Sequence, residues 1–438
     1  MKRIVRLNSI TLLALGALSL FSVVPATASD GYFAHGYGTK SKGMAGAGVA
    51  LSLDPMSGTV NPASLALYGS GYDLGAALFT PFRSYSVDGA PSGAPGTFGL
   101  GSGTVDSGNN AFGVPHFAFN KALDQKSSFN VMIYGNGGMN TTYPVSANGG
   151  AGTFYGGQAG VNLEQLFVSP GYARKVSTRT ALGLSALLAY QRFEARGLSQ
   201  FAGYVADGKA DCLCDRGDDH SYGFGARLGV LHQVNNKLSV GAAYQTQLAM
   251  SRFTKYSDLF AGQGSFDIPP SLTAGMAWKT SSKSVIAFDV QQIWYSAVGA
   301  VANPLANLAA AAQTQNPSGL LGGNAGAGFG WRDMTVYKLG YQWDAAKDWT
   351  LRTGVSYGQQ PIPSSEVLFN ILAPGVQEWH LTLGGTKRMG KASEMSFAFM
   401  YSPSKTVRGA NPLEAPGQQN IALQMHQFEA EASFGYKF

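Results

Sequence analysis

Apolar and polar side chains alternate along much of this chain. In residues 348–358 the apolar set is Trp349, Leu351, Thr353, Val355 and Tyr357, and the set between them is Thr350, Arg352, Gly354 and Ser356. A period of two residues predicts a β-strand with one apolar and one polar face. The last stretch repeats the pattern, with Phe428 and Phe438 on the apolar face and Glu429 and Glu431 on the other.

Stretches of this kind recur from Gly71 to the end of the chain. We predict strands at 71–86, 111–120, 128–142, 163–176, 180–194, 222–233, 237–250, 270–279, 284–295, 332–343, 348–358, 377–388, 393–403 and 425–438. Short polar turns alternate with long loops, and the turns fall at 121–127, 177–179, 234–236, 280–283, 344–347 and 389–392. Short periplasmic turns and long outer loops are typical of outer-membrane barrels. The sequence therefore predicts an all-β fold, a 14-stranded transmembrane antiparallel β-barrel over 71–438.

Composition separates this barrel from a soluble β-sandwich, which alternates in the same way. Only 13% of residues are charged, against about 25% in ordinary soluble proteins. Glycine accounts for 58 residues, aromatic residues for 12%, and the mean hydropathy is −0.02. After the N-terminal segment no apolar run approaches the roughly 18 residues that a spanning helix needs. These values indicate a membrane protein that crosses with strands.

Residues 1–28 have the pattern of a secretory signal peptide. Lys2, Arg3 and Arg6 precede an apolar stretch, and Ala26-Thr27-Ala28 forms an A-x-A cleavage site. The alternative, a membrane anchor helix, is disfavoured because the apolar stretch is short. We expect export through the Sec pathway to the outer membrane of a Gram-negative bacterium. Without the signal the net charge is +3, which gives no reason to expect a nucleic-acid partner.

Residues 29–70 contain much Gly and Ala and few bulky apolar residues, so we expect them to lie inside the barrel. Gly43-Met-Ala-Gly-Ala-Gly-Val-Ala50, Asp54 and Asn61-Pro62-Ala63 resemble the N-terminal plug, or hatch, of the FadL/TodX (OMPP1) family of outer-membrane transporters of hydrophobic compounds. The resemblance extends to Ser265–Gly275, Asp289–Trp294, Trp331–Asp333, Tyr337–Tyr341 and Asp348–Gly354. It implies hatch and gating roles for Gly43, Gly46, Gly48, Asn61, Pro62 and Ala63. The alternative is a Gly-rich linker.

The third predicted strand contains Tyr134-Gly-Asn-Gly-Gly138. Glycine inside a strand often marks a bulge or a bend. In the resembled family this strand kinks inward and leaves a lateral hole in the wall. We therefore place a lateral opening at Gly135, Asn136, Gly137 and Gly138. The alternative is an ordinary glycine-rich strand that faces the hatch.

Two outer loops carry apolar residues at helical spacing. The sets are Leu198, Phe201 and Val205 in one loop and Phe253, Tyr256 and Phe260 in the next. Spacing of i, i+3 and i+7 predicts helical faces, which could form a surface groove for a hydrophobic solute. The alternative is that the two faces pack against each other.

A fatty acid would need a lumenal cation for its carboxylate, whereas a hydrocarbon would need none. Strand position makes Arg174, Arg192, Arg227 and Arg352 the candidates. Residues Asp30 to Tyr37 depart from the pattern of the family's fatty acid transporters, so a fatty acid, an alkane and a monoaromatic all stay open as substrates.

Enzyme chemistry is not expected. Gly354-Val-Ser-Tyr-Gly358 matches G-x-S-x-G, but that motif needs a strand-to-helix turn and here it lies within an alternating strand. We expect no cofactor and no metal. The pair Cys212 and Cys214 fits a loop disulfide or unused thiols better than a metal site.

The predicted function is passive, hatch-gated diffusion of hydrophobic compounds with lateral exit into the membrane. The alternatives are a general diffusion porin or a structural barrel, and, more distantly, a lipase that uses Ser356. Expected partners are a hydrophobic solute, outer-membrane lipid and lipopolysaccharide. The C-terminal Phe438 resembles the signal read by the barrel assembly machinery, and we expect a monomer.

Overall fold

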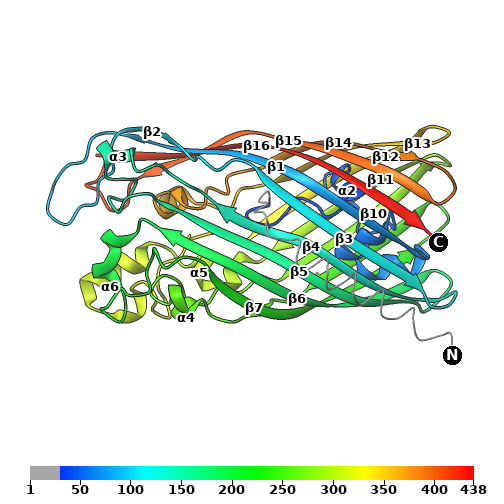
Figure 1. Cartoon of the computed structure of the whole chain (residues 1–438), viewed down its shortest axis with the longest axis horizontal. Coiled ribbons are helices and arrows are strands. Elements are labelled where there is room, and N and C mark those ends of the chain that lie inside the picture. The colour runs from blue at the N-terminus through cyan, green and yellow to red at the C-terminus, as the bar shows by residue number, and fades with distance from the viewer. Residues whose placement is uncertain (1–29) are drawn as a thin grey trace, which may run out of the picture.

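One antiparallel sheet closes on itself to form a barrel (Figure 1). This computed structural model describes residues 30–438, so the predicted signal peptide lies outside the described residues. β16 closes the barrel by pairing with β1 along its whole length. Fourteen strands form the wall, which confirms the predicted fold. They are β1 (Gly71–Asp88), β3 (Phe112–Ala122), β4 (Ser127–Asn140), β5 (Gly160–Lys175), β6 (Thr180–Arg196), β7 (Asp219–Gln233), β8 (Leu238–Gln245), β10 (Ser271–Ser281), β11 (Ser284–Ile293), β12 (Met334–Ala346), β13 (Trp349–Gly358), β14 (Trp379–Arg388), β15 (Ser393–Ala410) and β16 (Asn420–Lys437).

Long connections gather at the end of the barrel opposite the C-terminus (Figure 1). The expected strand at 237–250 is interrupted there, since β8 ends at Gln245 and the short β9 (Ala249–Met250) pairs with β7. The other elements of the long connections are β2 (Gly103–Asp106), α3 (Ala147–Gly150), η3 (Ser199–Tyr204), η4 (Thr254–Tyr256), α4 (Ala261–Gly264), η5 (Tyr295–Ala297), α5 (Gly299–Ala302), α6 (Ala306–Thr314), η6 (Pro317–Gly319), η7 (Ser364–Glu366) and η8 (Phe369–Ile371).

The two faces of each strand meet different surroundings. On β1, Leu74 and Leu78 are 52% and 53% exposed, while Asp73 and Ala77, the residues just before them, are buried. On β16, Phe428 is exposed and Glu429 is buried. The apolar set therefore points outward and the polar set inward, as the alternation predicts. Within residues 30–438, no helix is both long and apolar enough to cross a bilayer.

Residues 30–70, which we call the hatch, lie inside the barrel near its C-terminal end (Figure 1). The hatch contains α2 (Thr39–Lys42) and two short 3₁₀ turns, η1 (Pro55–Thr59) and η2 (Pro62–Leu67). η2 packs against β5, β6 and β7, and α2 packs against β14 and β15. Most of its residues are buried against the wall, so the hatch uses the inner face of the barrel as its core.

Candidate functional site

The segment Asn61-Pro62-Ala63 is held against the wall by the side chain of Asn61. Oδ1 of Asn61 accepts the Ala63 N–H at 3.0 Å and caps η2. Nδ2 donates to the carbonyls of Val49, at 2.7 Å, and Val230, at 2.9 Å. Pro62 occupies the first turn of η2, where a missing N–H costs nothing. One amide therefore joins two parts of the hatch to β7.

Inward-facing glycines on the wall make room for this contact. A Cβ on Gly229 would lie 2.1 Å from Oδ1 of Asn61, and a Cβ on Gly384 would lie 2.9 Å from Cα of Gly43. Such distances exclude any side chain while the hatch is in place. We call this set the wall glycines, and it comprises Gly183, Gly229, Gly241, Gly340, Gly354 and Gly384. The hatch glycines are marked by their sequence pattern, but these wall partners are not, because single glycines are common in barrel strands.

Gly46 and Gly48 of the hatch allow backbone conformations and contacts that a side chain would prevent. Gly46 has a φ of +81°, and a Cβ there would lie 1.9 Å from the carbonyl oxygen of His35. The N–H groups of Gly48 and Val49 both donate to Oδ2 of Asp289 on β11, at 2.7 and 2.9 Å. A buried wall carboxylate thus binds two backbone donors of the hatch.

A buried group of charges joins α2 to the wall, and we call it the charged anchor (Lys42, Glu429, Glu431, His116 and Asp73). Nζ of Lys42 contacts Glu429 directly and lies 2.6 Å from Oε2 of Glu431. His116 lies 2.8 Å from Asp73 and 3.5 Å from Glu431. Burial lowers the pKa of Lys42, but the two carboxylates outweigh it and hold the pKa above its ordinary value. Lys42 therefore stays charged.

Asp54 begins η1 with a capping box. Its Oδ1 accepts the Ser57 N–H at 3.1 Å, while Oγ of Ser57 accepts the Asp54 N–H at 3.2 Å. The side chain is buried, and burial raises the pKa of Asp54 to about 6 although the charge of Lys40 opposes the shift. Asp54 is therefore a hatch group whose charge changes at mildly acidic pH.

The wall is interrupted where the glycine-rich part of β4 begins. Pairing between β3 and β4 ends at Tyr134, and the β4–β5 register shifts between Gly135 and Gly137. On the other side, β1 pairs with β3 up to Phe79 and with β2 from Ser84 onward. Residues 80–83 of β1 and 135–140 of β4 therefore border a gap in the ladder, which we call the wall opening.

The first described residues of the hatch, 30–34, run along this gap, and we call them the N-terminal arm. The Ala34 N–H donates to the Asn136 carbonyl at 3.1 Å, and the Gly138 N–H donates to the Tyr32 carbonyl at 3.0 Å. A Cβ on Gly137 would lie 1.8 Å from the oxygen of Tyr32. Glycine at 137 is thus required for the arm to lie here.

Aromatic rings surround the N-terminal arm. The ring of Tyr32 lies 5.3 Å from Phe33, 5.4 Å from Tyr295 and 5.9 Å from Trp331, measured between centroids. Phe266 lies 6.1 Å from the same ring. Since Tyr295, Trp331 and Phe266 belong to long connections, this aromatic group joins the hatch to the loops.

All six residues expected to form a surface groove are buried. Short 3₁₀ turns replace the expected helices, and Phe193 on β6 lies 5.5 Å from Phe253, 4.9 Å from Tyr256 and 4.7 Å from Phe260. Leu198, Phe201 and Phe260 also line an apolar cavity of about 40 Å³ beneath the loops. The two sets pack inward as a loop cap, which we define as Phe193 with Leu198, Phe201, Val205, Phe253, Tyr256 and Phe260, and they form no open groove.

The four candidate arginines fall on both faces of the wall. Arg174 is exposed on the outer face, and Arg192 shares the outward register of its strand and lies 3.2 Å from Asp218. These two do not reach the lumen. Arg227 and Arg352 point inward and are buried. The sequence could not distinguish the two outward arginines from the two inward ones, because their positions along the strands did not fix which face each side chain lies on.

The serine of the G-x-S-x-G match lies in the regular strand β13. Oγ of Ser356 is 3.2 Å from Nδ1 of His380, and the other ring nitrogen of His380 faces the side-chain nitrogen of Gln427 at 3.3 Å. An amide in this position cannot orient and stabilise an imidazolium as a carboxylate does. Cys212 and Cys214 are unbridged.

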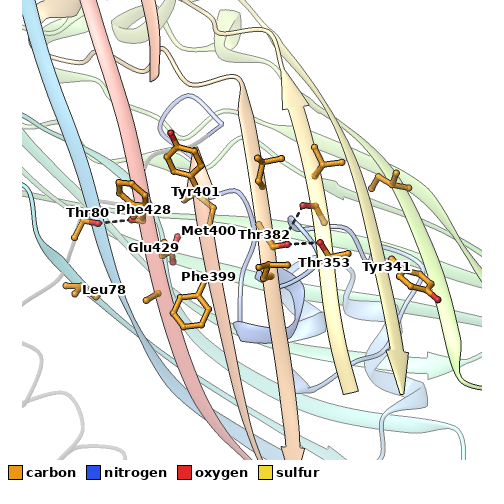
Figure 2. A pocket seen from close by; sticks show the side chains of 16 residues that line it. Leu78, Thr80, Tyr341, Thr353, Thr382, Phe399, Met400, Tyr401, Phe428 and Glu429 are labelled. Carbon is orange, nitrogen blue, oxygen red and sulfur yellow. Dashed lines mark hydrogen bonds between the residues drawn. The ribbon is translucent and has the colours of Figure 1, made fainter. Parts of the chain in front are cut away.

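A hollow of about 720 Å³ lies on the outer face of the wall (Figure 2). Leu78, Phe399 and Phe428 line it and are exposed. These residues belong to the outward set of β1, β15 and β16. The hollow therefore belongs to the apolar exterior and not to a path through the lumen.

The hatch carries Asn61-Pro62-Ala63, and β4 separates from β3 at the wall opening. The sequence of this chain matches a known family profile. The profile of "Outer membrane protein transport protein (OMPP1/FadL/TodX)" covers residues 21–433. The chain belongs to this family. FadL/TodX proteins are barrels of the outer membrane, which places this chain in the outer membrane of a Gram-negative bacterium.

Individual FadL/TodX relatives are distant in sequence. The chain is 23% identical over 328 residues to a long-chain fatty acid transport protein of Salmonella typhi, covering 70% of this chain and 73% of the relative. The toluene transporter TodX of Pseudomonas putida has a TM-score of 0.65 at 17% identity, covering 92% of this chain and 99% of its own. A FadL homologue of Pseudomonas aeruginosa has a TM-score of 0.66 at 14% identity, covering 93% and 100%. At these identities the structures support the shared fold.

Proposed function

We propose that this protein carries hydrophobic compounds across the outer membrane by passive diffusion. The solute would enter through the loop cap, occupy the lumen above the hatch, and leave sideways through the wall opening when the N-terminal arm moves. Long-chain fatty acids and aromatic or aliphatic hydrocarbons are the candidate solutes, in line with the names of the Salmonella typhi and Pseudomonas putida relatives.

The observation that supports this proposal is that the wall opening is occupied by the N-terminal arm, which is not a strand of the wall. Two backbone hydrogen bonds hold the N-terminal arm to β4, at Asn136 and Gly138. Each contributes a net free energy of about 1 kcal/mol. The start of the arm is also held by the buried ion pair of Asp30 with Lys338 on β12, 3.2 Å apart. Displacement of residues 31–34 breaks few bonds and leaves the barrel folded, whereas opening a full strand pair would break many backbone hydrogen bonds.

Entry would use the apolar character of the loop cap. Transfer of a solute from water gains about 0.8 kcal/mol for each CH₂ group buried. The cavity of about 40 Å³ has room for only a few water molecules. A solute with a ring or an alkyl chain must therefore displace aromatic side chains, and its own apolar surface would replace the contacts that they lose.

Within the lumen, Arg227 is the stronger of the two inward candidates for a carboxylate. It forms no ion pair with an acidic residue within residues 30–438 and donates to the Tyr134 hydroxyl at 3.0 Å and to Oε1 of Gln245 at 2.5 Å. Arg352 lies against the hatch and donates to Gln342 and Thr386. Arg227 also lines a small polar cavity together with Lys338. Since Lys338 is paired with Asp30 at 3.2 Å, Arg227 is the cation that a carboxylate there would bind.

Uptake of labelled oleate and toluene by cells tests the proposal. Gly137→Leu should abolish most protein-dependent uptake, because its side chain cannot coexist with the N-terminal arm and would occupy the wall opening. Gly113→Leu is the matched control, since a side chain at Gly113 on the neighbouring strand meets open space. Equal uptake by both variants, with both barrels assembled, would rule out exit at this place.

The same experiment separates the other functions. Protein-dependent entry of small sugars, with no dependence for oleate or toluene, would favour a general porin. A structural barrel would change none of these rates. Loss of lipid hydrolysis in Ser356→Ala would be needed to support a lipase.

A further inference from the structure

Arg83, a residue that sequence analysis did not single out, lies at the edge of the wall opening. It belongs to residues 80–83 of β1, which pair with β16 but have no ladder partner on the other side, and it points inward with 6% of its surface exposed. A strand crosses a bilayer in about 9–11 residues. Arg83 lies near the outer end of the 18-residue β1, so its height corresponds to the outer boundary of the membrane.

The contacts of Arg83 are all with neutral groups. Its Nη atoms contact the carbonyls of Asn140 and Asn109, and Nη2 lies 3.1 Å from Oδ1 of Asn110. The guanidinium lies over the ring of Phe112, 5.6 Å from its centroid. Within residues 30–438 it forms no ion pair, and its Nε has no hydrogen-bond partner. A buried guanidinium that lacks an anion is costly, and an arriving carboxylate would relieve that cost.

A cavity of about 30 Å³ adjoins this guanidinium. Phe79, Met139, Trp331 and Met425 give it apolar walls, and Gly31 of the N-terminal arm closes one side. A water molecule needs about 10–15 Å³ measured in this way, so the space holds two oxygen atoms. Two oxygens are what a carboxylate presents, and the apolar walls suit the first carbons of its chain.

We propose that Arg83 forms a carboxylate-binding site at the wall opening. An amphipathic monocarboxylate leaving the lumen would place one of its oxygens on the Nε–H of Arg83, the donor that has no partner among residues 30–438, while its chain passes between β1 and β4 into the membrane. Arginine suits this role because its guanidinium stays charged and forms charge-assisted hydrogen bonds with carboxylates. The site discriminates at the exit between ionised acids and neutral hydrocarbons. This inference rests on the proposed lateral exit and adds a substrate class to it.

Initial uptake rates of oleate and of oleyl alcohol, which has the same chain without the charge, test the site. In Arg83→Gln, oleate uptake should fall about tenfold, the loss expected for one charge-assisted hydrogen bond, while oleyl alcohol should stay within about twofold. Arg83→Lys keeps the charge and should recover much of the oleate rate. Arg174→Gln, an exposed arginine on the outer face, controls for assembly and surface charge. A parallel loss of both solutes would reduce Arg83 to a support for the loop at Asn109 and Asn110, and no loss of either would remove the site.

A crystallographic measurement decides the site even if Arg83→Gln does not assemble. Crystals of the wild-type protein soaked with 8-bromooctanoate should show an anomalous bromine peak beside the opening and a carboxylate on Nε, whereas 1-bromooctane should show no ordered position there. Bromooctanoate found only elsewhere would overturn the proposal. If wild-type cells take up neither oleate nor oleyl alcohol through the protein, the transport function fails, and the soak still reports separately on Arg83.

Discussion

The hatch and the loop cap fill the two ends of the same lumen by different physical means. The hatch is held by directional polar contacts, such as Lys42 with Glu431 and Gly48 with Asp289, and by close backbone approach at the wall glycines. The loop cap is held by aromatic packing around Phe193. Apolar contacts can be replaced by a hydrophobic solute with little loss, whereas ion pairs cannot.

Because of this difference, we expect the loop cap and the hatch to respond differently to a solute in the proposed transport. A hydrocarbon or an alkyl chain can compete with Phe253 or Phe260 for the same apolar surroundings, so the loop cap can admit it. The same solute has no charged group that could replace a member of the charged anchor, so the rest of the hatch, residues 35–70, keeps its place. Movement is then expected at residues 31–34 of the N-terminal arm, where aromatic contacts from Tyr32 to Tyr295 accompany two backbone hydrogen bonds to β4. The ion pair of Asp30 with Lys338 keeps the start of the arm in place.

Removal of Lys42 should have the largest effect on this comparison. Lys42→Met leaves Glu429 and Glu431 buried side by side without their cation, which costs about 3–5 kcal/mol when one member of a buried pair is lost. Hydrogen exchange across residues 38–67 should accelerate, and entry of small polar solutes should rise as the hatch loosens. Exchange within the loops should stay unchanged.

A second substitution checks that charge causes the Lys42 effect. Glu431→Gln in the Lys42→Met background removes one of the two uncompensated charges and should restore part of the protection. If hatch exchange in Lys42→Met equals that of the wild type, the charged anchor does not hold the hatch.

Truncation of Phe193 is the converse test at the other end. Phe193→Ala removes the ring that Phe253, Tyr256 and Phe260 share, at a cost of about 3 kcal/mol for a buried aromatic side chain. Exchange should accelerate in residues 197–218 and 246–270 and stay slow in the hatch. Leu228→Ala, on the exposed outer face, is the control. Faster exchange at both ends would show that the two regions form one cooperative unit.

A single methyl group on the wall should have a moderate effect confined to the hatch. In Gly229→Ala the new Cβ would lie 2.1 Å from Oδ1 of Asn61, so the Asn61 segment must shift. Overpacking of this kind costs about 1–3 kcal/mol. Gly113→Ala adds the same methyl where nothing lies within 4 Å and should leave thermal stability unchanged. Similar melting temperatures for the two variants would argue against wall glycines as a docking surface.

The barrel itself was predictable because its information is local. Period-two alternation and turn composition located all fourteen wall strands, and the same alternation placed Glu429 and Glu431 on the lumenal face. Which cation meets these carboxylates was not predictable. Lys42 lies 387 positions before Glu429, and nothing in either neighbourhood marks the other as its partner.

The contacts of the predicted site residues depend in the same way on partners that lie far apart in the sequence. Helical spacing correctly selected Phe253, Tyr256 and Phe260 as one face, but it could not say that Phe193 covers that face. The glycine run at 135–138 was a local signal, whereas the arm that lies on it comes from about a hundred positions earlier. Arg83 carried no signal, since its importance arises from partners that β1 loses in three dimensions.

The mildest perturbation of the hatch is a change of pH, because it alters the protonation of Asp54 and removes no atom. The pKa of Asp54 is about 6 in the folded hatch against an ordinary value of 3.8. A raised folded pKa means that the folded hatch binds this proton more tightly than the unfolded chain does. Its contribution to stability is complete below about pH 4 and is lost as the pH rises through about 6.

Hydrogen exchange of residues 38–67 between pH 4.5 and pH 7.5 measures this contribution. Comparing the wild type with Asp54→Asn at each pH cancels the intrinsic pH dependence of exchange. The variant keeps an oxygen that accepts the Ser57 N–H but cannot ionise, so its protection should exceed that of the wild type by a small margin at pH 4.5 and by a larger one at pH 7.5. Exchange in the loop cap should not differ between the wild type and the variant at either pH. A wild-type hatch that becomes more protected with rising pH relative to Asp54→Asn would mean that Lys40 stabilises the carboxylate more than burial destabilises it.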